Sequence, residues 1–322
     1  IIPPASYYEV GYISYLYAVI YATYGFMPVL INFMNVIFHL LTAILIYQSV
    51  VSIFDHRAAY LSALFFLLNP VSFYYSSVKL QESIFIFVVY FSIYCFLMAI
   101  KKSNYRYVFI IFPLFYIIYA LLKMHYFIPI LLAFATSSMI ILFKNKKKVC
   151  FILIAFILFS LTIMNTNALG KVKFYIGKSL DDIVIYQKGF CSSGGQIYKL
   201  FITGKDSRDY TLIDWSVYIL KGWYHMLSEP ILSSGISVKL ILFYPLKIIF
   251  LILCALAVPG ILMAIRYGHI EAVIFISIFV ILGTGIAMSS GNVGTMLRHR
   301  DVITPVIFIF SSVFINRFRF IK

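Results

Sequence analysis

Long apolar segments constrain this chain more than any other feature of its sequence. A helix needs about 20 apolar residues to cross the hydrocarbon core of a bilayer, and segments near that length recur from end to end. Because a backbone in lipid must satisfy its own hydrogen bonds, we expect an all-α polytopic bundle with about nine visible crossings. The predicted spans are 27–54, 59–76, 82–100, 107–122, 126–143, 149–167, 248–265, 272–288 and 302–316.

The composition excludes the soluble classes of protein. Hydrophobic residues make up 63% of the chain and charged residues 11%, whereas soluble domains have about 25% charged residues. The net charge of +15 comes largely from short connectors between apolar segments. No polar segment carries a basic stripe with interleaved aromatic residues, so the sequence does not predict nucleic-acid binding.

The placement of the basic residues predicts the topology. Positive charge marks cytoplasmic connectors, and the short connectors after every second span are basic and almost free of acids. We therefore expect a multi-pass membrane protein with a cytoplasmic C-terminus and with outer segments at 1–26, 77–81, 123–125, 168–247 and 289–301. The basic connector residues are Arg57, Lys101, Lys102, Arg106, Lys144, Lys146, Lys147, Lys148, Arg266, Arg317, Arg319 and Lys322.

Three parts follow from this pattern. Residues 1–167 form an N-terminal membrane module with an interfacial helix at about 11–25 and six spans. Residues 168–247 form a polar outer segment that ends in an amphipathic stretch from Ile236 to Lys247, and residues 248–322 add three spans. Asn69-Pro70 predicts an interruption inside the second span. The chain begins at Ile1 without Met, and we read it as lacking its native N-terminus.

Polar residues at the predicted outer ends of the spans are the candidates for chemistry. If residues 79–82 are helical, Lys79 and Glu82 share a face, with Lys79 attracting an anion and Glu82 acting as a base, an orienting group or a ligand of a divalent cation. The alternative is an interfacial ion pair of little energetic value. His39, inside the first span, is expected to be a neutral, hydrogen-bonded packing residue.

The stretch from Ser289 to Asp301 carries positive charge on a side where the positive-inside trend does not place it. Gly291 and Gly294 predict a tight loop that exposes its backbone. Arginine offers a planar fork for phosphate oxygens, so we expect phosphate binding here. The alternative is a basic flank of the last span. The predicted phosphate-binding residues are Arg298, His299 and Arg300, with Lys79 and, more weakly, Lys123 and His125.

Several outer residues have two readings each. Glu9, Asp181, Asp182 and Glu229 could each be a general base or a solvated loop acid. Trp223 and His225 could line a sugar-binding surface or anchor the chain at the interface. The four cysteines form no metal-binding or disulfide pattern, and the sequence has neither a P-loop nor a strand-linked glycine fingerprint for nucleotides.

Five features together resemble a known family. They are the run from Gly11-Tyr12 to Tyr24-Gly25, Asn35, Asn69-Pro70, the Ser76–Glu82 segment and the sequence GNVGTMLRHRD before the last span. The pattern resembles the GT-C fold membrane glycosyltransferases that use polyprenyl-phosphate sugars. Within them it is similar to the protein O-mannosyltransferases and aminoarabinose transferases, grouped as glycosyltransferase family 39.

This resemblance implies an enzyme of the bacterial inner membrane that takes a sugar from a polyprenyl-phosphate-linked donor on the outer face. The acceptor would be a hydroxyl of a glycan, a lipid or a protein of the cell envelope. In such enzymes an acidic residue of the first outer loop serves as the base or as a metal-linked carboxylate. Glu9 is the only acid left in that region of this chain, and we expect the catalytic base upstream of Ile1.

Two alternatives remain open. A cell-envelope polysaccharide polymerase or ligase shares the lipid-linked substrate but moves whole oligosaccharides. A non-enzymatic transporter or flippase needs a polar path at the bilayer midplane, and the predicted spans carry few ionisable residues besides His39.

Overall fold

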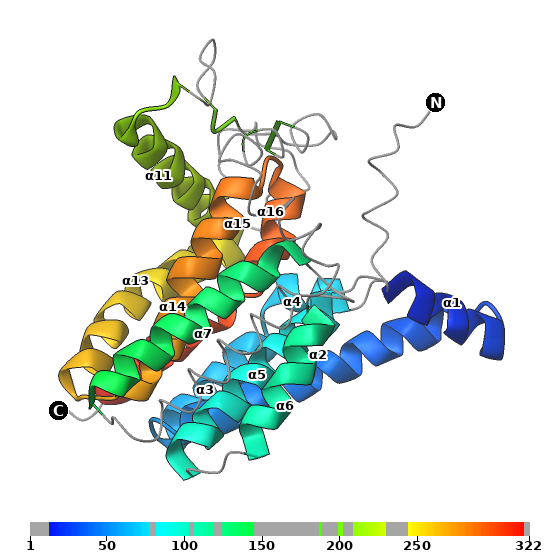
Figure 1. The fold of residues 1–322 in the computed structure, drawn as a ribbon, viewed down its shortest axis with the longest axis horizontal. Helices are drawn as coiled ribbons and strands as arrows, with labels where there is room; N and C mark the ends of the chain where they lie inside the picture. Colours follow the sequence, from blue (N-terminus) through cyan, green and yellow to red (C-terminus); the bar gives the residue numbers. More distant parts are fainter. Residues whose placement is uncertain are drawn as a thin grey trace. The chain divides into compact units, whose positions relative to one another are not determined.

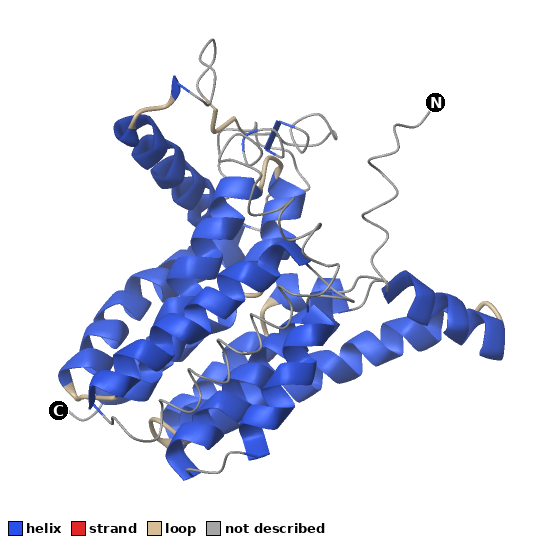
Figure 2. Cartoon of the chain, in the orientation of Figure 1, coloured by secondary structure: helices blue, strands red, loops and turns tan. Residues whose placement is uncertain are grey.

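The structure is a computed structural model. It describes residues 13–76, 82–102, 106–118, 124–144, 209–229 and 244–318, together with 184, 187–188 and 199–201. The described residues form helices and connecting turns without a strand (Figure 2). The all-α fold predicted from the apolar segments is therefore confirmed. The chain divides into two compact units, residues 1–131 and residues 132–322.

The first unit is built around α5 (Figure 1). Its other helices are short or partly exposed, and α7 crosses the boundary between the units. The helices are α1 (Ile13–Tyr24), α2 (Pro28–Val51), α3 (His56–Leu67), α4 (Pro70–Ser76), α5 (Glu82–Lys102), α6 (Arg106–Ile117) and α7 (Met124–Lys144). Helix α2 packs against α3 and α5, and α5 packs against α6.

Local sequence signals explain where these helices begin. Pro28 occupies the first turn of α2, where its missing N–H is not needed. Asp55 caps α3, because its side chain accepts a hydrogen bond of 2.8 Å from the backbone N–H of Ala58. The interruption predicted at Asn69-Pro70 is present between α3 and α4, and the Asn69 side chain donates to Ser72 Oγ at 2.6 Å.

Helices α2 and α5 show two environments within this unit. The side chains of α5 are buried along almost its whole length. One side of α2 is buried, including Ile31, Asn35 and Ile46. Its other side exposes Val29, Phe33 and Ile44, as expected of a helix that meets lipid.

The second unit contains the C-terminal helices. A nearly continuous apolar helix covers 270–289: a 3₁₀ turn (Ile270–Ala272), α14 (Val273–Ser277), a π-helical turn (Ile278–Leu282) and α15 (Gly283–Ser289). The other elements are α11 (Leu212–Ser228), α13 (Tyr244–Arg266), α16 (Val293–Arg300) and α17 (Thr304–Phe318). Helices α13 and α17 pack closely, and Ser311 Oγ donates to the carbonyl of Leu253 at 2.7 Å.

Within the described part of the chain, four helices are long and apolar enough to cross a membrane by length and composition. They are α2, α5, α13 (from Pro245) and the 270–289 run, and shorter apolar helices occur at Arg106–Ile117, Tyr126–Ile141 and Thr304–Arg317. These helices coincide with the predicted spans, α3 and α4 together taking the place of the second span. The predicted span at 149–167 lies outside the described residues.

The structure differs from the sequence prediction at Gly294 and at Lys247, and it adds a helix in the polar outer segment. Gly294 lies in α16 rather than in an exposed loop, because the Asn292 side chain caps that helix by accepting from the backbone N–H of Thr295 at 2.7 Å. The polar outer segment contains α11, whose N-terminus is closed by a capping box between Thr211 and Asp214. Helix α13 begins at Tyr244, so Lys247 belongs to that helix.

Candidate functional site

Glu82 lies in a buried polar cluster of the first unit. It is the first residue of α5 and its side chain is 2% exposed. A helix N-terminus favours negative charge, which explains how a carboxylate can be held there. Asn35, fully buried on α2, and Tyr17 on α1 accompany it. We call Tyr17, Asn35 and Glu82 the α5 cluster.

The Tyr17 phenol reports the electrostatics of the α5 cluster. Its pKa is raised from 10.0 to about 12, first by burial and then by the negative charge of Glu82, while the Asn35 side chain opposes the shift. Burial disfavours the charged phenolate, and a neighbouring carboxylate disfavours it further. Near neutral pH the cluster therefore presents a neutral phenol, an amide and a carboxyl group, which together suit the hydroxyls of a sugar.

Four of the predicted site residues fall where the structure describes no side chain. Lys79, Lys123 and Glu9 lie outside the described residues. His125 lies in α7, but its side chain is not among those described. Their predicted roles in phosphate binding, and that of Glu9 as a base, stay predictions.

In the second unit, the structure separates the three basic residues of α16. Consecutive residues of a helix point in different directions. Arg298 is half-buried, whereas His299 and Arg300 are each 5% exposed. The sequence suggested one phosphate-binding group, but only Arg298 keeps a partly open side chain.

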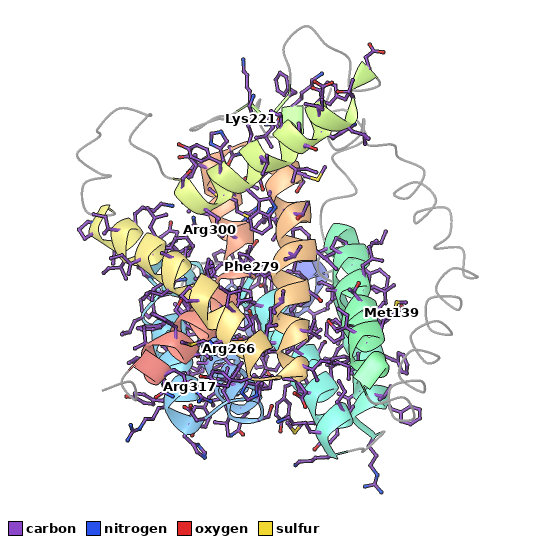
Figure 3. The ribbon with its side chains drawn as sticks, turned by 90° about the vertical axis from the view of Figure 1, so that its left-hand side faces the viewer. Met139, Lys221, Arg266, Phe279, Arg300 and Arg317 are labelled. Atoms are coloured by element: carbon purple, nitrogen blue, oxygen red, sulfur yellow. The ribbon has the colours of Figure 1, made fainter. Side chains whose placement is uncertain are left out.

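Arg300 instead contacts the C-terminal end of α11. Its guanidinium nitrogen Nη1 donates to the carbonyls of Met226 at 2.9 Å and Glu229 at 3.2 Å, and its Cζ lies 4.4 Å from the centre of the Phe250 ring. Figure 3 shows Arg300 on the side of α11 that faces the apolar helices. The last carbonyls of a helix lack partners within the helix and carry partial negative charge.

Lys247 completes this arrangement from α13. Its ammonium donates to the carbonyls of Leu227 at 2.7 Å and Glu229 at 2.6 Å, and it lies 5.3 Å from the centre of the Phe250 ring. We call Lys247 and Arg300, with the carbonyls that they bind, the α11 clamp. Sequence reasoning missed Lys247, although a lone lysine at the start of an apolar segment was a visible signal.

The structure also places residues for which the sequence left two interpretations. Trp223 Nε1 donates to Thr284 Oγ1 at 3.2 Å, and its ring packs on Phe279, so it is a packing residue of the second unit. His225 Nδ1 lies 3.0 Å from Glu229 Oε1. His39 packs on the Phe66 ring, with 4.5 Å between the ring centres. Its Nε2 makes no hydrogen bond among the described residues, which differs from the hydrogen-bonded side chain expected.

The described residues contain no group of three His, Cys, Asp or Glu side chains that could hold a metal ion. The divalent cation considered for Glu82 therefore stays a prediction.

Part of the chain matches the model of a known protein family. Residues 12–164, a little under half of the chain, match the family model of the dolichyl-phosphate-mannose-protein mannosyltransferases. No curated protein matches the chain. The family match confirms the predicted resemblance to GT-C membrane glycosyltransferases, and the matched range includes Tyr17, Asn35 and Glu82.

Proposed function

We propose that this chain is a bacterial inner-membrane glycosyltransferase that transfers a sugar from a polyprenyl-phosphate-linked donor to an acceptor hydroxyl on the extracytoplasmic face. The observation that carries the proposal is the family match over residues 12–164. A glycosyltransferase that acts from within a membrane needs membrane-spanning helices and a group of polar side chains beside them that can bind a sugar. The apolar helices and the α5 cluster meet these two needs.

The reaction requires three events. The acceptor oxygen forms a bond to the anomeric carbon, the bond from that carbon to the phosphate oxygen breaks, and the acceptor proton moves to a base. The leaving group is the polyprenyl phosphate, which positive charge stabilises as it departs. We assign Arg298 and Lys79 to the phosphate, with His299, Lys123 and His125 as weaker candidates.

We assign Glu82 either to the base or to orienting the sugar. A base must lie within hydrogen-bond reach of the proton that it takes. The Glu82 side chain is buried, and its charge is close enough to the Tyr17 phenol to raise the pKa of that phenol. If another acidic residue is the catalytic base, Glu82 instead orients the donor.

Transfer from a labelled polyprenyl-phosphate sugar, measured in membranes that contain the full-length protein, tests the proposal. We expect labelled sugar to move to an acceptor and unlabelled polyprenyl phosphate to be released. Movement of the donor across proteoliposomes without cleavage would overturn the proposal in favour of a flippase. Transfer of only long oligosaccharides would indicate a polymerase or ligase.

Two variants separate the assigned roles. Arg298→Ala should lower transfer at least tenfold while expression stays normal, and unchanged transfer would remove Arg298 from the site. Glu82→Gln keeps the shape of the side chain and removes its charge. If Glu82 is the base, this variant should lower the maximal rate more than the apparent affinity for the donor.

A further inference from the structure

Helix α11 is fixed to the second unit along one side. Tyr218 donates its hydroxyl hydrogen to the carbonyl of Met288 at 3.0 Å. A Cβ added at Gly222 would come within 2.6 Å of the Ala287 carbonyl oxygen, so the two backbones are in close contact. In Figure 3, α11 lies across the ends of α13 and α15. The orientation of α11 about its own axis is therefore set by these contacts.

Trp223 shows which side of α11 points toward the apolar helices. It reaches Thr284 and Phe279, which lie one turn and more than two turns before Met288 in the 270–289 run. Trp223 thus points deeper along that run than Tyr218 does. By helical periodicity, Asp214 and Lys221 lie on the side of α11 opposite Trp223. The Lys221 side chain is exposed.

A third side of α11 is apolar and exposed. Ile213, Val217, Leu220 and Tyr224 are spaced by four, three and four residues, so they form one stripe. Ile213 is 76% exposed, Leu220 67% and Tyr224 60%. Exposed apolar residues in a continuous stripe mark a contact surface, whereas single ones need no explanation.

The end of this stripe lies beside the start of a membrane span. The α11 clamp ties the C-terminal end of α11 to Lys247, in the first turn of α13. The residues that follow, Ile248, Ile249 and Ile252, are more than half exposed on a helix apolar enough to cross a bilayer. The apolar surface of α13 begins where α11 ends, which argues that the same partner covers the stripe of α11 and the exposed side of α13.

We propose that α11 is an interfacial helix that lies in the headgroup layer of the bilayer. Its Ile213–Tyr224 stripe contacts lipid acyl chains, and Lys221 faces water. A helix with one apolar and one charged side takes up this position at a membrane surface, and tyrosine favours the interface. The inference rests on the membrane location of the chain and not on the proposed enzymatic activity.

Spin labels at two neighbouring positions test the proposal. Leu220→Cys and Lys221→Cys would each be made in the full-length protein, with the four native cysteines replaced by alanine, and labelled with a nitroxide in lipid nanodiscs. We expect the label at 220 to meet oxygen, which concentrates in lipid, and the label at 221 to meet a water-soluble nickel chelate. The ratio of the two accessibilities should differ several-fold between the positions.

Two outcomes would overturn the proposal. Equal exposure of both labels to the nickel chelate would place the stripe in water. Shielding of the label at 220 from both reagents would mean that another segment or a second copy of the chain covers the stripe.

If the cysteine-free protein does not fold, benzoylphenylalanine at 220 and at 221 in the otherwise native chain answers the same question. Irradiation in bilayers should give lipid adducts at 220 and not at 221, as measured by mass spectrometry. Protein crosslinks at 220 would contradict the proposal.

Discussion

At the scale of single residues, burial and a neighbouring charge set the pKa of a polar side chain. Tyr17 is the clearest case, because burial and the nearby Glu82 carboxylate together raise its pKa to about 12. The ordinary value is 10.0, so the folded chain keeps the proton more tightly than the unfolded chain. This contribution to stability is complete below about pH 10 and is lost as the pH rises through about 12.

The first prediction concerns the link between Tyr17 and Glu82. Removing the carboxylate charge with Glu82→Gln should lower the pKa of Tyr17, because one of the causes that raise it disappears. Carbon-13 NMR of tyrosine labelled at Cζ would follow the titration, and loss of one signal in Tyr17→Phe would assign it. A Tyr17 titration that does not change in Glu82→Gln would show that the two groups are not neighbours.

The second prediction concerns Gly260. A Cβ at this position would clash with the backbone carbonyl oxygen of Phe310, so Gly260 sets the approach of α13 to α17. Gly260→Ala should destabilise the protein by about 1–3 kcal/mol, as overpacking does. Thermal unfolding in detergent measures the loss.

Gly294 provides the matched control for Gly260. It also lies in a helix, but an added Cβ would meet only Asn292 Oδ1 at 3.7 Å. Gly294→Ala should be neutral or stabilising, because alanine is the better helix former. Equal destabilisation by the two substitutions would contradict the packing argument.

At the scale of elements, the position of α11 could not be predicted from the sequence. Thr211 and Asp214 have the spacing of a capping box, but they lie in a polar segment that the sequence predicts to be an outer loop. The contacts that hold α11 join residues about 60–75 positions apart, such as Tyr218 with Met288 and Arg300 with Met226. No local pattern encodes such pairs, so the sequence could not predict that Arg300 binds the end of α11.

The third prediction follows from the α11 clamp. Arg300→Leu removes the donor to the carbonyls of Met226 and Glu229, and buried carbonyls that lose a charged donor destabilise their helix. Backbone amides of 223–229 should exchange hydrogen faster, as measured by mass spectrometry in detergent. Arg298→Leu, on the same helix but with a half-buried side chain, should leave that exchange unchanged.

Arg300→Lys keeps the charge but not the planar fork. This variant should restore only part of the protection of the 223–229 backbone amides from hydrogen exchange. Full protection in Arg300→Leu would show that Lys247 alone holds the end of α11.

At the scale of the whole molecule, the apolar segments predicted the helices well because burial in lipid follows from composition and length alone. The spans at 82–100 and 248–265 correspond to α5 and α13 within a few residues. The site was predicted less well, since it depends on side chains from separate elements. Tyr17, Asn35 and Glu82 come from three helices, and only the structure brings them together.

The last prediction concerns the orientation of the second unit in the membrane. Arg266 and Arg317 lie at one end of its helices and α11 lies at the other (Figure 3). The Arg317 guanidinium lies over the Tyr267 ring at 4.6 Å, which brings the ends of α13 and α17 together. Because basic residues favour the cytoplasmic side, this end should face the cytoplasm and Lys221 should face outward.

Cysteine labelling in intact cells measures that orientation. In the cysteine-free protein, Lys221→Cys should react with a membrane-impermeant maleimide, whereas Arg266→Cys should react only after the membrane is opened. A fluorescent protein fused after Lys322 should fluoresce, because it folds in the cytoplasm. The reverse labelling pattern would place α11 on the cytoplasmic face, where the proposed donor sugar is not expected, and the extracytoplasmic reaction would then have to be abandoned.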